Sequence, residues 1–149
     1  GEIQFGEYPQ KPASRLNILY LSYYRFLFVK QIAPAKRKRY KYLAKHLADV
    51  DGITILHPQI DKKTVPYVFS MLVSKFRDSL FKALLKEGYP VWVWPSLPKI
   101  IHEELPKHPD VMRLGQQLLQ IQLYEIHPVD YESLVERIKY YLKNIELHN

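Results

Sequence analysis

The sequence has no cysteine, few glycines and no long hydrophobic run. The lack of cysteine excludes disulfide scaffolds, thiolate metal centres, iron–sulfur clusters and cysteine nucleophiles. With 5 glycines among 149 residues, the chain has neither glycine-rich motif that binds nucleotide phosphates, G-x-G-x-x-G or G-x-x-x-x-G-K-[ST]. Its most apolar stretch, Leu16–Val29, is interrupted by Asn17, Ser22 and Arg25 and is shorter than the about 20 residues that span a bilayer. No secretory signal is recognisable. We therefore expect a soluble, cytoplasmic protein.

The overall composition is that of one folded, basic domain. Lysine and arginine number 22 against 15 acidic residues, so the formal net charge is +7, and 47% of the residues are hydrophobic. A hydrophobic fraction of this size excludes wholesale disorder, and the length suits one domain. Residues 1–13 are expected to form an extended lead-in and residues 14–149 a single domain. The chain starts at Gly1 and not at Met, so we expect either a trimmed chain or a piece of a longer protein.

Periodic apolar residues predict several helices, and residues that favour helix ends mark their limits. Ser14 is expected to cap the first helix, Gly88 to end the third and Asp130 to cap the last. Proline can start a helix but interrupts one that is already running, so Pro34 is expected to separate the first helix from the second. The predicted helices are Ser14–Gln31, Pro34–Asp49, Phe76–Leu85, Pro98–Leu105, one from Pro109 and one after Asp130.

Short runs rich in β-branched and aromatic residues predict the strands. The last run alternates apolar residues with glutamines, which predicts a half-buried strand. Together with the helices, these runs indicate an α+β two-layer fold: a small, mostly antiparallel sheet covered by helices, with a helical N-terminal segment. The predicted strands are Ile53–Leu56, Val65–Val73, Val91–Trp94 and Gln120–Leu123.

A run of basic residues in the second predicted helix is the strongest electrostatic feature. With tyrosines between the charges, it could bind a polyanion. The alternative is a solvated helix face, and the helical phase favours it, because Tyr40 and Leu43 lie on the apolar side. We therefore do not expect nucleic acid as a partner, and keep polyanion binding as an alternative function. The candidate residues are Lys36, Arg37, Lys38, Lys41 and Lys45.

No pattern in the sequence forms a self-contained catalytic or metal site. The six histidines include no H-E-x-x-H motif, and the neighbours Glu103 and Glu104 do not face each other on a helix. No serine lies in a G-x-S-x-G context. We therefore predict no catalytic residue and no metal ligand.

Two tryptophans before a proline-rich loop form the candidate binding surface. In a strand, Trp92 and Trp94 share one face, and the loop that follows contains Ser96 between Pro95 and Pro98. These residues could form one wall of a substrate pocket. The alternative is that both tryptophans pack in the core beneath a helix. The substrate-pocket candidates are Trp92, Trp94 and Ser96.

The order of several short motifs, from Arg15 to Leu142, resembles a known family. The chain is similar to the C-terminal small domain of the fold-type I, pyridoxal-phosphate (PLP) dependent aminotransferases, specifically the DegT/DnrJ/EryC1/StrS group of sugar aminotransferases. The match begins with the apolar helix from Arg15 and ends with a strand, a proline and a closing helix. The motifs between them are Lys36–Leu43, Gly52-Ile53, Val65–Phe69, Arg77–Leu80 with Gly88-Tyr89, Trp94–Pro98 and Leu114–Leu119.

The resemblance implies a domain that shapes the substrate pocket and the dimer and is not catalytic alone. In the family, the Schiff-base lysine and the acidic partner of the pyridine nitrogen lie in the large N-terminal domain. PLP is therefore expected in the full-length parent and not on this chain alone. The chain also lacks the family's histidine after the loop proline. A degenerate, non-catalytic scaffold or oligomerisation domain is the other alternative.

The first predicted helix is apolar on nearly every side, so it should be covered on more than one side. One small sheet cannot cover both sides. We expect the missing large domain or a homodimer partner to cover the rest, with Leu21 or Phe28 in the contact. The alternative is that the arm Gly1–Pro12 folds back over this helix within a monomer.

Overall fold

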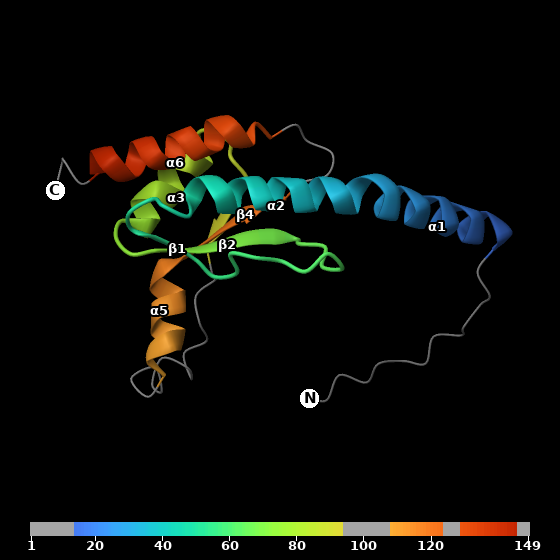
Figure 1. The fold of residues 1–149 in the computed structure, drawn as a ribbon, viewed down its shortest axis with the longest axis horizontal. Coiled ribbons are helices and arrows are strands. Elements are labelled where there is room, and N and C mark those ends of the chain that lie inside the picture. The colour runs from blue at the N-terminus through green and yellow to red at the C-terminus, as the bar shows by residue number, and fades with distance from the viewer. Residues whose placement is uncertain (1–13, 94–107, 124–128, 146–149) are drawn as a thin grey trace, which may run out of the picture.

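The computed structural model describes residues 14–93, 108–123 and 129–145. In this part of the chain, helices cover one face of a four-stranded antiparallel sheet whose strand order is β1-β2-β4-β3 (Figure 1). This architecture, with its helical N-terminal segment, confirms the predicted α+β class. The strands are β1 (Ile53–Ile55), β2 (Val68–Val73), β3 (Val91–Val93) and β4 (Leu118–Gln122). The helices are α1 (Arg15–Leu27), α2 (Ala33–Leu47), α3 (Arg77–Lys86), α5 (Pro109–Gln117) and α6 (Tyr131–Ile145).

The helices α1 and α2 form one continuous rod, so the predicted break at Pro34 is wrong. A π-helical turn, η1 (Phe28–Ile32), joins them without a loop. Proline has no N–H to donate, and its ring collides with the carbonyl four residues earlier. A π turn shifts the hydrogen-bond register, and here the Ala33 N–H bonds to the carbonyl of Phe28, five residues back. The chain thus accommodates the proline by widening one turn.

The rod leaves the body of the protein at its α1 end, which projects away from the sheet (Figure 1). No residue of α1 is buried. The expectation that the sheet covers one side of this helix is therefore wrong: Leu16 is 77% exposed, Tyr20 67% and Leu21 60%. Within the described residues, bulky apolar side chains remain exposed on all sides of α1.

The hydrophobic core lies between the sheet and the helices α2, α3 and α6. The strand register places Phe69, Ile121 and Val91 in one row on the helix-covered face. Phe69 packs edge-on against Tyr40 of α2, with ring centroids 5.0 Å apart. The apolar faces of α2 and α6 were predicted from their spacing, and their central residues are fully buried. These include Leu43 and Leu47 of α2 and Leu134 and Ile138 of α6.

The helix ends predicted from single residues are confirmed. The Ser14 hydroxyl accepts a hydrogen bond from the Asn17 N–H at 3.2 Å. Asp130 accepts from the N–H groups of Glu132 and Ser133 at 3.0 and 3.1 Å. Gly88, just past α3, has φ +83°, a conformation in which glycine is unstrained.

The strand β4 is more central than its sequence suggested. It begins at Leu118, pairs with both β2 and β3, and has Gln122 buried as well as Leu119 and Ile121. The prediction of a half-buried strand is therefore wrong for its C-terminal end. The lead-in 1–13 and the helix predicted at Pro98–Leu105 lie outside the described residues. No helix in the described ranges is both long and apolar enough to cross a membrane.

Candidate functional site

The face of the sheet opposite the core carries a row of one aromatic and two polar side chains. The register aligns Trp92 of β3 with Gln120 of β4, and Gln120 with Ser70 of β2. The Gln120 amide Nε2 donates to the Ser70 hydroxyl at 3.2 Å. Because successive side chains of a strand point to opposite faces, this row lies on the face opposite the core. The row therefore offers an indole beside a fixed amide and a hydroxyl.

Trp92 itself is not a core residue, since 57% of its surface is exposed while its neighbour Val91 is 2% exposed. Core packing of Trp92, the alternative interpretation from the sequence, is therefore wrong. Trp94 and Ser96, the other two predicted pocket residues, lie outside the described residues. Gln120 and Ser70 were not predicted, because only the strand register, which the sequence does not reveal, brings them beside Trp92.

The helix α5 lies on the opposite side of the sheet from α2 and α6 (Figure 1). It leads directly into β4 and contacts β2 and β4. Arg77 at the start of α3 holds this junction, donating to the carbonyls of Gly115 at 2.9 Å and Leu118 at 3.4 Å. Its Nε lies 2.9 Å from the Asp78 carboxylate, although the contact lacks hydrogen-bond alignment. Arg77 thus has a structural role at this junction.

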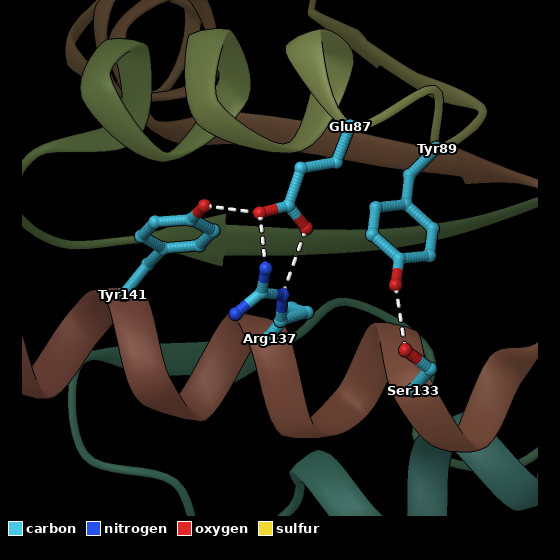
Figure 2. A network of polar contacts seen from close by, with 5 residues as sticks. All are labelled: Glu87, Tyr89, Ser133, Arg137 and Tyr141. Carbon is cyan, nitrogen blue, oxygen red and sulfur yellow. Dashed lines mark hydrogen bonds and ion pairs between the residues drawn. The ribbon is translucent and has the colours of Figure 1, made fainter.

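A polar cluster joins the end of α3 to α6 (Figure 2). The Arg137 guanidinium reaches both carboxylate oxygens of Glu87, at 2.7 and 2.9 Å, and the Tyr141 hydroxyl donates to the same carboxylate. The hydrogen bond from Tyr141 and the Arg137 cation lower the pKa of Glu87, and the same hydrogen bond raises the pKa of Tyr141. Beside them, the hydroxyls of Tyr89 and Ser133 are 2.7 Å apart. The cluster therefore joins the C-terminal end of α3 to α6.

The basic run lies along α2 and divides into two environments. Lys36 is 5% exposed, and its ammonium lies 5.3 Å from the centre of the Tyr67 ring. Lys38, Lys41 and Lys45 are exposed and Arg37 is half-buried. A fully solvated face is therefore wrong for Lys36, whose long aliphatic stem allows burial. Three of the remaining cations face a groove beside the chain between β1 and β2.

The described residues contain no candidate metal site. They contain no group of three or more histidine, cysteine, aspartate or glutamate side chains that could hold a metal ion.

Comparison with known proteins identifies a likeness of fold. No protein-family model matches the chain, and no curated protein matches it. The chain is similar to the crystal structure of 3-amino-5-hydroxybenzoic acid (AHBA) synthase, with a TM-score of 0.61 and 13% sequence identity. The likeness covers 78% of this chain but 36% of that one. The chain thus spans about a third of the AHBA synthase chain and shares the fold of that part.

Proposed function

We propose that this chain is the C-terminal small domain of a PLP-dependent, aminotransferase-like protein, with residues 14–149 as one unit. The observation that carries the proposal is the likeness to about a third of AHBA synthase, whose name states an amino-substituted product. The motif order from Arg15 to Leu142 points to the same class of enzyme independently of the fold comparison.

The chain's own residues do not fit the cofactor. PLP needs a lysine for its Schiff base in an enclosed site, with an acidic partner for the pyridine nitrogen. Within the described residues, the buried lysine is Lys36, which lies against Tyr67, and the other lysines are exposed. The proposal therefore assigns the cofactor and its chemistry to a separate large domain, and no reaction step to this chain.

The role left to the small domain is to shape the substrate pocket and exclude water from it. The sheet face opposite the core suits this role at β3, because Trp92 offers an exposed apolar surface beside the Gln120 amide. Trp94 and Ser96, which follow Trp92 in the chain, complete the proposed wall. The identity of the substrate would then depend on contacts with this wall as well as with the large domain.

The apolar helix α1 supplies the proposed junction with the rest of the protein. Its exposed side chains suit a large apolar interface, provided by the large domain or by a second copy. Either partner would hold the pocket wall in place through the continuous rod of α1 and α2.

Two measurements test the proposal. The isolated chain, mixed with PLP and reduced with borohydride, should show no stoichiometric adduct at one specific lysine in peptide mapping. Such an adduct would overturn the assignment of the cofactor to the large domain.

The full-length parent should bind PLP and transfer an amino group. In that parent, Trp92→Ala should raise KM for the acceptor substrate. A folded parent that binds no PLP would instead support the degenerate scaffold.

A further inference from the structure

A basic groove of about 490 Å³ lies between α2 and the chain that connects β1 to β2. Four of its lining residues are cations and one is acidic. The helix contributes Arg37, Lys38 and Lys41, and the connecting chain adds Lys62 from the opposite side, a residue that the sequence did not single out. The lining residues are Pro34, Arg37, Lys38, Lys41, Ile60, Asp61 and Lys62.

The positive charge of the groove is not neutralised within the described residues. There, neither Lys38, Lys41 nor Lys62 forms an ion pair. The carboxylate of Asp61 accepts a hydrogen bond from the Lys63 N–H at 2.8 Å and keeps its negative charge, so it offsets one of the four positive charges of the lining. Like charges four residues apart on a helix repel each other, and Arg37 and Lys41 form such a pair. An anionic ligand would remove this repulsion.

Two hydrogen bonds hold the walls of the groove in place. The Tyr40 hydroxyl donates to the His57 carbonyl at 2.6 Å, and Arg37 donates to the Thr64 carbonyl at 3.3 Å. These bonds fasten both ends of the connecting chain to α2, so Lys62 faces the helix without a ligand present. A preformed site loses less entropy on binding than one that must be ordered.

We propose that this groove binds a small ligand that carries two or more linked phosphate groups. Its volume lies in the range of small-molecule sites, about 300–1,000 Å³. Lysines on both walls suit a ligand with charge on several sides, and arginine adds a planar donor for phosphate oxygens. Among the described residues, the lining contains no aromatic side chain on which a nucleic acid base could stack, so the ligand would be recognised through its phosphates. The proposal is independent of the aminotransferase-like role.

Inorganic tripolyphosphate is the probe that tests the groove. Titration calorimetry on the unmodified chain should show one site, with affinity that falls steeply as salt is raised. The double variant Lys41→Glu, Lys62→Glu should weaken binding at least about tenfold, which corresponds to about 1.4 kcal/mol. The control Lys82→Glu, Lys86→Glu makes the same change in net charge at exposed positions of α3. It should change the affinity less than about twofold if recognition is local.

Three results would overturn the proposal. One is the absence of saturable tripolyphosphate binding, and another is an equal loss of affinity in both double variants, which would mean attraction to net charge alone. The third is tighter binding of a short DNA duplex than of tripolyphosphate at physiological salt, which would assign the groove to nucleic acid. Circular dichroism checks that each variant is folded. If the glutamate variant does not fold, Lys41→Gln with Lys62→Gln takes its place, with a smaller expected loss of affinity.

Discussion

The exposed helix α1 predicts that the isolated chain associates with itself. Leu19 is 66% exposed, on the side of α1 that also carries Leu16, Tyr20 and Tyr23. Full burial of a leucine side chain is worth about 1.5–3 kcal/mol, so covering the exposed part of Leu19 is worth about 1–2 kcal/mol. In a two-fold symmetric dimer, Leu19 of each of the two copies lies in the interface. Leu19→Glu should therefore cost about 2–4 kcal/mol per dimer, a weakening of roughly 30- to 1,000-fold.

Asn17→Glu is the matched control. It introduces the same negative charge two residues away, where a helix presents the opposite side. Position 17 is also the third residue after the Ser14 cap, where glutamate completes a capping box and stabilises the helix. Asn17→Glu should therefore leave the association intact if the contact uses the side of Leu19, and should weaken it if the contact uses the side of Leu21 and Phe28, the residues expected there from the sequence. Phe28 is less suited to this test because it is half-buried, so its replacement would also disturb the fold.

Sedimentation or light scattering over a range of concentrations measures the association, and urea unfolding monitored by circular dichroism measures stability. Because Leu19 is exposed in the monomer, its replacement should change the free energy of unfolding by less than about 0.5 kcal/mol. An unmodified chain that stays monomeric at every accessible concentration would refute self-association. An equal loss of association in both variants would refute the assignment to one side of α1.

The remaining predictions concern the sheet face opposite the core, the junction at α5 and the α3–α6 cluster. Trp92→Ala should lower the free energy of unfolding by about 1–2 kcal/mol, because less than half of this residue is buried. Phe69→Ala should lower it by about 3–5 kcal/mol, because Phe69 is fully buried; equal losses in urea unfolding would place Trp92 in the core. Arg77→Ala should cost about 1.5–3 kcal/mol in the same assay, since the guanidinium donates to two carbonyls; a neutral effect would contradict its structural role. The lowered pKa of Glu87 means that its ion pair stabilises the fold above the unfolded-state pKa of about 4.3 and ceases to do so as pH falls through the folded-state pKa. Glu87→Gln should therefore lower the free energy of unfolding near pH 7. The difference in this free energy between the variant and the unmodified chain should become smaller at acidic pH. A difference that does not change with pH would show that the charge of Glu87 is not involved.

Local signals in the sequence predicted the elements of the fold well. Ser14, Gly88 and Asp130 act through hydrogen bonds or backbone conformations that involve only neighbouring residues, so their roles could be predicted from position alone. The burial of α6 followed from its apolar spacing. The break expected at Pro34 is absent because a π turn, Phe28–Ile32, allows the helix to continue past the proline. Helix propensities of single residues do not predict such a turn.

Features that depend on long-range pairing could not be predicted. The alignment of Trp92 with Gln120 and Ser70 requires the strand order β2-β4-β3, in which the last of the described strands lies between two earlier ones. Lys62 joins the basic groove only because hydrogen bonds from α2 hold the connecting chain beside it. Burial of a lysine such as Lys36 also depends on which side chain lies opposite.

The continuous rod of α1 and α2 gives the protein a lever. From Arg15 to Leu47 it extends about 50 Å, at about 1.5 Å per residue. One end of the lever is fixed in the core by Leu43 and Leu47, whereas the other carries exposed apolar side chains. The π turn between them is a natural point of bending. With about 20 Å of helix beyond that turn, a bend of about 10° would displace the tip by roughly 3–4 Å. A partner bound at α1 would thus move by ångströms relative to the sheet for a few degrees of change in one helical turn.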